Sequence, residues 1–219
     1  MYIFQFIADM LHFLSFLIII KQIKKTRTVS ELSYRTQEIY LIVFLSRYMD
    51  IFLYFISLYN LTFKIMFISA TCYIIYLIRF AKPYCLAYDK NTDSLNHYLY
   101  IYPSALILTI LFHMNSNYYK TFEYFWSFSI WLEAFAIIPQ LYIIYKKKEV
   151  EIVTGTYMAC LGLYRFFYII NWIYQYTIGI HLTGIKIFAA IIQTIIYGDF
   201  LYYYLKSVKS QSTNIILPV

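Results

Sequence analysis

Ionisable side chains interrupt stretches of sequence that are otherwise apolar, and these are the side chains best able to do chemistry. Gln5, Asp9 and His12 recur at i, i+4 and i+7, which is one stripe of a helix. At about 1.5 Å per residue, His12 lies roughly 16 Å into its stretch, near the middle of a bilayer. An imidazole can change its charge between about pH 5 and 8. Because ionisable groups at bilayer depth are costly, the stripe predicts a cavity or a bound partner.

Arginines and acids occupy comparable depths in other apolar stretches. Arg47 and Asp50 can share one helix face, and Glu133 and Arg165 each lie within a later stretch. Planar guanidinium groups suit a carboxylate, whereas carboxylates beside a tryptophan face suit a cation. Further polar and aromatic candidates in these stretches are Tyr48, Glu123, Trp126, Tyr164, Tyr168, Asn171, Trp172 and Gln175. All lie between the centre of their stretch and the end on the same side of the predicted membrane. This common position predicts a polar cavity that is open on that side.

A structural interpretation stands beside this functional one. The arginines and acids could neutralise each other in pairs between helices and only fix the packing. Asp9 and Asp199 are interpreted as structural or gating residues, because Asp199 lies apart from the other groups, near the opposite end of its stretch.

The elements that must position these groups are long and apolar. The chain has 219 residues, of which 62% are hydrophobic, 22% aromatic and 13% charged, far from the composition of soluble proteins. Seven apolar stretches fit its length, which predicts an all-α membrane protein. The expected spans are residues 1–20, 37–58, 61–80, 98–113, 122–145, 152–176 and 183–206. Residues 1–206 then form the transmembrane domain, and residues 207–219 a short cytosolic tail.

The basic residues decide the expected orientation. Of the eighteen lysines and arginines, thirteen fall on one side of the predicted membrane. Lys64, Lys120 and Lys186 fall on the other side, and Arg47 and Arg165 lie inside spans. The positive-inside rule therefore predicts a lumenal N-terminus and a cytosolic C-terminus.

Several functions are disfavoured. Cys72, Cys85 and Cys160 have no disulfide or zinc spacing, and no phosphate-binding or dinucleotide-binding motif occurs, so we expect no enzyme, cofactor or metal. The net charge of +7 needs no nucleic acid, because basic loops beside a membrane face anionic lipid.

Longer motifs carry a family resemblance. The stretches SYRTQEIYLIVFLSRYMDIF, FWSFSIWLEAFAIIPQL, LGLYRFFYIINWIY and QTIIYGDFLYYYL resemble the ER lumen protein-retaining receptors, known as KDEL receptors. The resemblance covers nearly the whole chain. It implies seven helices in two triple-helix halves joined by the fourth helix, similar to SWEET and PQ-loop transporters, with Pro139-Gln140 as the PQ element. It also implies a receptor of endoplasmic reticulum and Golgi membranes that binds C-terminal retrieval tetrapeptides in the acidic Golgi and releases them in the neutral ER.

The resemblance also implies roles for individual residues. Arg47 and Tyr48 match the anchor for the terminal carboxylate of the ligand. The pocket for its basic first residue is matched by Asp50, Glu123 and Trp126, and further lining by Arg165, Tyr168, Asn171 and Trp172. The protonation switch is matched by His12 with Tyr164 and Glu133. Trafficking residues, including the tail that recruits the COPI coat, are matched by Asp199, Glu149, Glu151, Lys206 and Lys209.

Some positions depart from the family pattern. Glutamines stand at positions 5 and 175, where the family usually has arginines that hold the acidic residues of the signal. A neutral amide loses the charge-assisted part of such a bond, roughly 1–3 kcal/mol each. Glu31 replaces a usual glycine, and Lys206 and Lys209 are sparser than the usual lysine cluster. These departures put the signal preference and the coat binding in question.

Two further hypotheses remain open. The fold shared with SWEET-type carriers permits a small-solute transporter, which would need a polar path through the membrane. Gln5 and Gln175 favour a receptor relative that has lost ligand binding and acts in trafficking alone. A peptide-binding titration separates the second hypothesis from a retrieval receptor.

Overall fold

Helices make up most of the protein. The computed structural model describes residues 3–52, 57–113, 120–180 and 184–217. Its α-helices are α1 (Ile3–Thr26), α2 (Tyr34–Arg47), α3 (Leu58–Arg79), α4 (His97–Leu111), α5 (Lys120–Phe135), α6 (Ile138–Lys147), α7 (Ile152–Thr177) and α8 (Gly184–Lys209). The short elements are the 3-10 helices η1 (Met49–Phe52) and η2 (Tyr84–Ala87) and the strands β1 (Glu149–Glu151) and β2 (Asn214–Ile216).

The expected membrane helices are present as long apolar elements. Within the described residues, α1, α3, α7, α8 and the combined stretch Phe122–Lys147 are long and apolar enough to cross a membrane, and α4 is a shorter apolar helix. The all-α membrane class is thereby confirmed, while the count of seven spans stays a prediction. Residues 1, 2 and 183, at the ends of two expected spans, lie outside the described residues.

The second expected span, residues 37–58, is not one helix. The α-helix ends at Arg47, Tyr48 caps it, and the chain turns into η1. A new helix starts after Ser57, whose hydroxyl accepts a hydrogen bond from the Asn60 amide at 3.2 Å. Ser57 therefore acts as an N-cap inside a run of residues that looks continuously apolar in sequence. Residues 53–56, which also belong to this expected span, lie outside the described residues.

Pro139 interrupts the fifth expected span. The chain leaves the helix after Phe135 and re-enters it at Ile138, with Pro139 in the first turn of α6, where its missing amide hydrogen costs nothing. The next residue, Gln140, is fully buried. Its side chain donates to the Glu31 carbonyl (2.6 Å) and accepts from the Ser33 amide (2.8 Å). The PQ element thus fastens the start of α2 to the break between α5 and α6.

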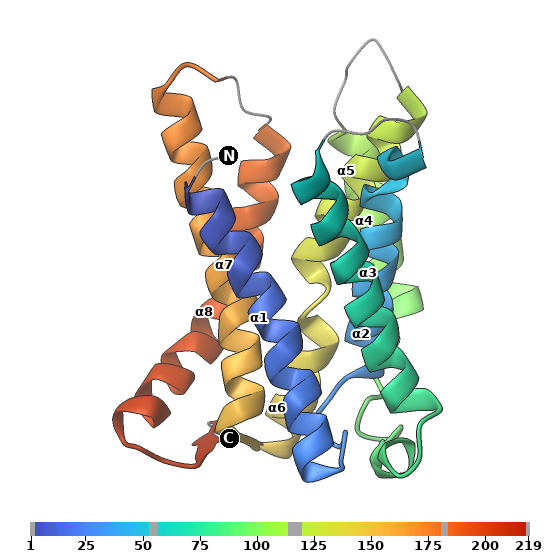
Figure 1. Ribbon diagram of the computed structural model, residues 1–219, viewed down its shortest axis with the longest axis vertical. Coiled ribbons are helices and arrows are strands. Elements are labelled where there is room, and N and C mark those ends of the chain that lie inside the picture. The colour runs from blue at the N-terminus through green and yellow to red at the C-terminus, as the bar shows by residue number, and fades with distance from the viewer. Residues whose placement is uncertain (1–2, 53–56, 114–119, 181–183, 218–219) are drawn as a thin grey trace.

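The helices form two groups that face each other. Figure 1 shows α1, α7 and α8 on one side and α2, α3, α4 and α5 on the other. α1 packs against α7, α7 against α8, and α2 against both α3 and α5, while α5 also contacts α8. The division into two triple-helix halves stays a prediction.

The lower end of the molecule in Figure 1 is basic. The last turns of α1, α3, α6 and α8 carry Lys24, Lys25, Arg79, Lys146, Lys147, Lys206 and Lys209. Cations at helix C-termini are favoured by the helix dipole. Basic residues that the sequence analysis assigned to one side of the membrane therefore lie at one end of the bundle.

A buried carboxylate organises the long connection between α3 and α4. Asp93 is fully buried and accepts hydrogen bonds from Ser33 Oγ (3.0 Å) and Tyr88 Oη (2.8 Å). Burial, together with the charge of Asp93, raises the pKa of the Tyr88 phenol above its ordinary value. Tyr88 therefore remains a hydrogen-bond donor at neutral pH, and the connection is tied to the start of α2.

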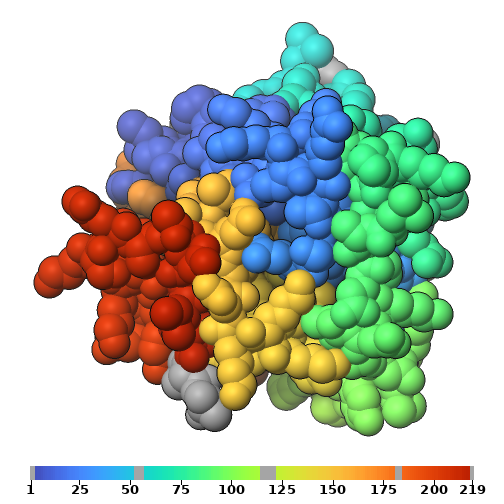
Figure 2. All heavy atoms as spheres, turned by 90° about the horizontal axis from the view of Figure 1, so that it is seen from below, coloured from blue at the N-terminus to red at the C-terminus, as the bar shows by residue number. Residues whose placement is uncertain are grey.

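The C-terminal segment is part of the folded molecule. β2 pairs antiparallel with β1, and Ile215 and Leu217 are buried beneath it. In Figure 2, which views this end from below, the C-terminal segment lies beside the stretch that joins α6 to α7. α8 also continues to Lys209, past residue 206. The division of the chain at residue 206 into domain and tail stays a prediction.

Candidate functional site

A cavity of about 550 Å³ lies between the two helix groups. Side chains from α1, α2, α3, α5, α7 and α8 line it. Most candidates from the sequence are among them: Gln5, His12, Arg47, Tyr48, Trp126, Glu133, Tyr164, Arg165, Tyr168, Asn171, Trp172 and Gln175. Segments far apart in sequence therefore converge on one site.

Glu133 holds the two arginines of the cavity together. Its Oε2 lies 2.6 Å from Arg47 Nη2 and 2.5 Å from Arg165 Nη2. Its other oxygen, Oε1, accepts a hydrogen bond from Tyr164 Oη at 2.6 Å. Glu133 is only 2% exposed, so water screens these interactions little. One carboxylate thus faces two guanidinium groups, so these three groups together carry a net positive charge.

Each arginine has further interactions. Arg47 donates to Ser129, from Nε to Oγ (3.1 Å) and from Nη2 to the carbonyl (3.2 Å). The guanidinium of Arg165 lies 5.3 Å from the centre of the Tyr164 ring, and its Nε is buried without a hydrogen-bond partner in the structure. Arg165 is thus held by its ion pair with Glu133 and its contact with the Tyr164 ring.

His12 is enclosed by aromatic rings. It stacks on Tyr164 with ring centroids 4.2 Å apart and an interplanar angle of 4°, and on Phe67 at 4.7 Å. The side chain is 5% exposed, and Nε2 is buried without a hydrogen-bond partner. His12 thus contacts Tyr164 by stacking, and the Tyr164 hydroxyl bonds Glu133.

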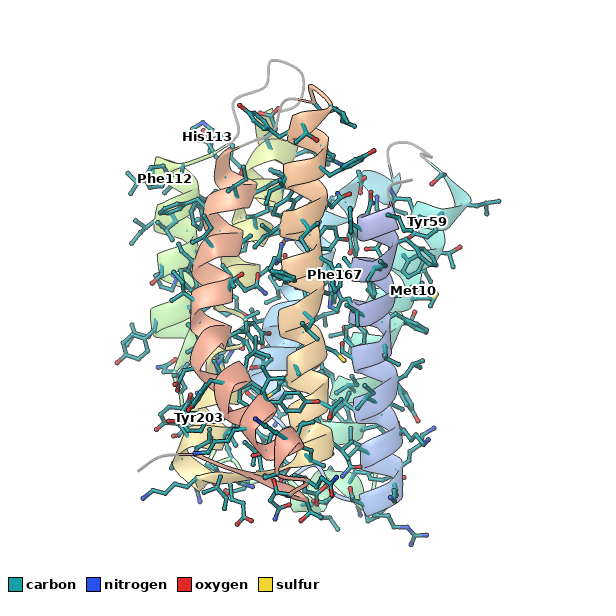
Figure 3. All side chains as sticks on the ribbon, turned by 90° about the vertical axis from the view of Figure 1, so that its left-hand side faces the viewer. Met10, Tyr59, Phe112, His113, Phe167 and Tyr203 are labelled. Carbon is teal, nitrogen blue, oxygen red and sulfur yellow. The ribbon has the colours of Figure 1, made fainter. Side chains whose placement is uncertain are left out.

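Asp9 joins α1 to two other helices. It accepts a hydrogen bond from Tyr59 Oη of α3 at 2.7 Å and another from Tyr168 Oη of α7. Figure 3 shows Tyr59 at the upper end of the molecule beside α1. Asp9 also lines the cavity. Its bonds to two helices fit the structural role expected from the sequence, which stays a prediction.

Two lysines also line the cavity. Lys64 Nζ lies 2.6 Å from Asp50 Oδ2, and Lys186 Nζ lies 4.9 Å from the centre of the Trp126 ring. Lys64 and Lys186 lie within α3 and α8, near the starts of the expected spans 61–80 and 183–206, where the sequence analysis counted them as charges on the sparsely charged side. Asp50 pairs with Lys64 rather than with Arg47, because α2 ends at Arg47 and the i, i+3 relation no longer applies.

Buried tyrosines fill the space below the arginine pair. Tyr40 Oη lies 3.5 Å from Tyr197 Oη, and Gln37 Nε2 donates to Tyr157 Oη at 2.8 Å. All four side chains are buried, at 2% exposure or less. Among the described residues, each of these four side chains makes a hydrogen bond, although Gln37 Oε1 has no partner.

The other candidates are not lining residues of the cavity, although Asp50 contacts one of those residues, Lys64. Asp50 and Glu123 are not among its lining residues. Asp199 accepts a hydrogen bond from Tyr145, Glu149 from Asn214, and Glu151 from Gln22. Lys206 and Lys209 are exposed near the end of α8, the end at which Figure 3 places Tyr203. The expected trafficking residues thus gather at the end of the bundle opposite Trp126.

Sequence reasoning missed nine of the residues that line the cavity, among them Tyr59, Lys64 and Lys186. A signal was available for the lysines, because they are the few basic residues on the sparsely charged side. Nothing in the sequence distinguished Tyr59, because it is one of 27 tyrosines in the chain.

The arrangement is suited to binding an anion. Arg47, Arg165, Lys64 and Lys186 line the cavity against the carboxylates of Asp9 and Glu133. Among the described residues, no group of three His, Cys, Asp or Glu side chains could hold a metal ion. The cavity can therefore bind a carboxylate through charge-assisted hydrogen bonds.

The sequence of this chain matches a known protein family. The family described as ER lumen protein retaining receptor matches residues 28–175. ER lumen protein-retaining receptors of Plasmodium falciparum and Petunia hybrida are 41% and 40% identical to this chain, each covering 100% of it and 98% and 100% of their own lengths. The receptor of Dictyostelium discoideum is 38% identical, with both chains fully covered. The chain therefore belongs to the family of ER lumen protein-retaining receptors.

Proposed function

We propose that this protein is a pH-dependent receptor that binds the C-terminal peptide of escaped ER lumenal proteins and returns them to the ER. The observation that carries the proposal is the pairing of Arg47 and Arg165 with the single carboxylate of Glu133. A C-terminal carboxylate is the terminal group that such a site would recognise, because two oxygens can accept from guanidinium donors together.

The charge balance at the arginine pair supports the binding of a second carboxylate. Arg47 and Arg165 both line the cavity and share one carboxylate, so an incoming carboxylate would gain charge-assisted hydrogen bonds. Arg47 is held in place by Ser129, so its guanidinium is oriented before the ligand arrives. Tyr48, capping α2 beside Arg47, would complete this anchor.

His12, Tyr164 and Glu133 form the proposed pH switch. Protonation would add a third cation beside the Arg47 and Arg165 pair, in a site largely closed to water. An incoming carboxylate would offset this added charge. The ligand then favours protonated His12, and protonation favours the ligand by the same factor. Binding in an acidic compartment and release in a neutral one follow from this linkage.

The remaining lining would recognise the rest of the peptide. Tyr168, Asn171 and Trp172 belong to one face of α7 above Arg165, and Gln5 and Gln175 present neutral amides. These amides would weaken the preference for acidic residues in the signal. Asp50, Glu123 and Trp126 would form the pocket for a basic residue of the ligand, and of these three Trp126 lines the cavity.

Trafficking roles would belong to the opposite end. We assign Asp199, Glu149 and Glu151 to transport of the receptor, and exposed Lys206 and Lys209 to recruitment of the COPI coat. This assignment requires a multi-pass protein of ER and Golgi membranes with its N-terminus in the lumen and its C-terminus in the cytosol. The basic lower end, which would face anionic lipid, supports that orientation.

A small-solute carrier is the second candidate function, favoured by the polar cavity between facing helix groups. The buried layer of Tyr40, Tyr157 and Tyr197 below Glu133 argues against a through path. Uptake of labelled sugars or amino acids into liposomes containing the purified protein would establish the carrier function instead.

The proposed function is tested by a binding titration with purified receptor. A labelled peptide ending in the Lys-Asp-Glu-Leu type of signal is compared with a scrambled peptide at about pH 5.5 and about pH 7.2. We expect specific binding that is tighter at the lower pH. Equal binding of the two peptides, or none by either, would favour a relative that acts in trafficking alone.

A further inference from the structure

A second cavity, of about 420 Å³, lies at the basic end of the bundle. It is lined by the start of α2, the end of α3, the start of α4 and the connection between α3 and α4. These segments lie at the lower end of the molecule in Figure 1, and in Figure 2 on the side opposite the C-terminal segment. The volume is typical of small-molecule sites, which measure about 300–1,000 Å³. The cavity shares no lining residue with the one that contains the arginine pair.

Three basic side chains line this second cavity: Arg35, Arg79 and Lys90. The guanidinium of Arg79 lies 4.7 Å from the centre of the Tyr34 ring. Among the described residues, neither Arg79 nor Lys90 forms an ion pair with a carboxylate. A guanidinium over an aromatic face can still use its planar set of N–H groups to bind a phosphate. Two of the three cations are therefore not neutralised by an acid of the described chain.

The acids at this cavity are bound by other groups. Glu38 lines the cavity, accepts a hydrogen bond from Tyr98, and lies 3.1 Å from His97 Nε2. Asp93 lies 3.8 Å from Arg35 Nε and is fully buried outside the lining. The lining among the described residues thus combines three cations with one carboxylate.

Two further charged residues lie beside the lining. Asp89 lies next to Lys90 in the chain and accepts a hydrogen bond from the Asn91 amide at 2.9 Å. Lys146 Nζ donates to the Asn91 carbonyl (2.9 Å) and to Oγ of the lining residue Ser94 (3.5 Å). These two charges cancel, and Asp93 offsets one of the lining cations, so the surroundings of the cavity remain positive.

The start of α4 also favours an anion. Asn96, His97 and Tyr98 line the cavity, and the Asn96 side chain makes no capping bond. The N-terminal end of a helix carries a partial positive charge. The His97 side chain is 3% exposed, and its Nδ1 has no hydrogen-bond partner in the described part of the chain. Helix dipole and basic side chains therefore act in the same direction.

The position of the cavity favours a lipid over a soluble anion. Phe80 follows the lining residue Arg79, Leu99 follows the lining residue Tyr98, and both apolar side chains are exposed, as residues facing a bilayer would be. Basic pockets between membrane helices at the cytosolic end suit phosphorylated lipid headgroups. A phosphate monoester carries a charge of about −1.5 to −2 near neutral pH, which two unneutralised cations can balance.

We propose that this cavity binds the headgroup of an anionic lipid that carries a phosphate monoester, with Arg35, Arg79 and Lys90 holding the phosphate oxygens. The inference goes beyond the proposed function. It does not depend on peptide binding, because the two cavities have separate linings.

The test is a displacement titration with the full-length receptor in detergent, at fixed salt and near neutral pH. A labelled short-chain phosphatidylinositol monophosphate is displaced by the same unlabelled lipid, by phosphatidylinositol, or by the free headgroup inositol bisphosphate. We expect the monophosphate lipid to bind about tenfold or more tightly than either competitor, since one lacks the monoester and the other the acyl chains. No saturable binding of the labelled lipid, or equal affinity for phosphatidylinositol, would overturn the proposal. Equal affinity for the free headgroup would assign the cavity to a soluble phosphate instead of a lipid.

Three variants locate the site. Arg79→Gln and Lys90→Gln should each weaken binding of the monophosphate lipid about fivefold, the effect of one basic residue near an anionic lipid. Lys24→Gln is the matched control, because Lys24 is an exposed cation at the same end that lies over the Tyr73 ring at 5.3 Å and does not line the cavity. Its affinity should equal that of the wild type. Equal losses in all three variants would indicate attraction to the basic end as a whole and would overturn a defined site.

Peptide binding provides the independent readout. Arg79→Gln and Lys90→Gln should bind a retrieval-signal peptide as the wild type does, because neither residue lines the peptide cavity. Lys90 is exposed, so Lys90→Gln decides the case if Arg79→Gln lowers the Tm. Wild-type lipid affinity in Lys90→Gln would then overturn this inference alone. Absence of peptide binding by the wild type would overturn the proposed function and leave the lipid site standing.

Discussion

The imidazole of His12 lies face to face on the phenol ring of Tyr164, with centroids 4.2 Å apart and planes inclined by only 4°. The same phenol donates its hydrogen bond to Glu133, which pairs with both arginines. The residue best able to change charge near neutral pH is thus one ring away from the proposed carboxylate anchor. In the proposed receptor, proton binding and ligand binding would therefore influence each other directly.

His12→Phe should abolish most of the pH dependence of peptide binding. Phenylalanine can stack on Tyr164 and Phe67 but cannot take up a proton. Between about pH 7.2 and about pH 5.5, one fully coupled proton changes the affinity at most roughly fiftyfold. We expect the wild-type ratio to approach that limit and the variant ratio to fall towards one, measured by peptide titration.

His113→Phe is the matched control, because His113 stacks on Tyr124 and does not line the cavity. Its affinity ratio should equal that of the wild type. If the pH ratio persisted undiminished in His12→Phe, another group would have to be the proton sensor, with Glu133 and Asp50 the next candidates.

Glu133→Gln should destabilise the empty receptor. The change leaves Arg47 and Arg165 close together without their shared carboxylate, and removing one partner of a buried ion pair costs about 3–5 kcal/mol. A peptide carboxylate could replace the lost charge. We therefore expect a lower Tm without peptide and a larger increase in Tm on peptide addition than in the wild type.

Glu38→Gln provides the comparison. Glu38 pairs with His97 at 3.1 Å near the opposite end of the bundle, and its side chain is 22% exposed. Removing a partly exposed pair of this kind costs only about 0–1 kcal/mol. A Glu133→Gln variant with wild-type Tm would show that the buried pairing contributes no net stability.

Gln5→Arg combined with Gln175→Arg should strengthen the preference for acidic residues in the middle of the signal. Both glutamines line the cavity, so added guanidinium groups would offer charge-assisted bonds. Peptides with acids or amides at the two central positions measure the effect. If neither the affinity nor the acid-to-amide ratio changed in the double variant, the two side chains would not face the ligand.

Gly155→Ala should loosen the C-terminal strand. A Cβ at position 155 would lie 2.2 Å from Ile215 Cδ1, in a site where Ile215 is fully buried. Overpacking of this kind costs about 1–3 kcal/mol. Thermal unfolding should show a lower Tm, and limited proteolysis should cleave the C-terminal segment faster.

Gly198→Ala on α8 is the control for helix propensity, since a Cβ there meets no atom within 4 Å. Alanine is favoured over glycine in a helix by about 1 kcal/mol, so its Tm should not fall. Equal Tm values for wild type and Gly155→Ala would mean that Ile215 moves aside without cost.

The long apolar helices were predictable from sequence, whereas their interruptions were only partly so. The expected sixth span, residues 152–176, matches α7 (Ile152–Thr177) because hydropathy alone defines a helix of that length. Pro139 signalled the break before α6. The end of α2 at Arg47 had no comparable signal, because the apolar run continues beyond it and the N-cap of Ser57 depends on the folded backbone.

The composition of the site was more predictable than its pairing. Helical stripes brought Gln5, Asp9 and His12 to one face, and all three line the cavity. Which acid meets which base depends on tertiary structure: Glu133 reaches across from α5 to Arg47 and Arg165, and Lys64 takes Asp50. Sequence spacing within one helix cannot reveal such pairs.

The most direct test of the proposed function compares one signal peptide as a free acid and as a C-terminal amide, with the wild type and Arg47→Ala. If the arginine pair binds the terminal carboxylate, amidation should weaken binding to the wild type by about 2 kcal/mol or more, or roughly thirtyfold. Arg47→Ala should bind the free acid more weakly and discriminate less between the two peptides. Equal affinity of the wild type for free acid and amide would contradict this account.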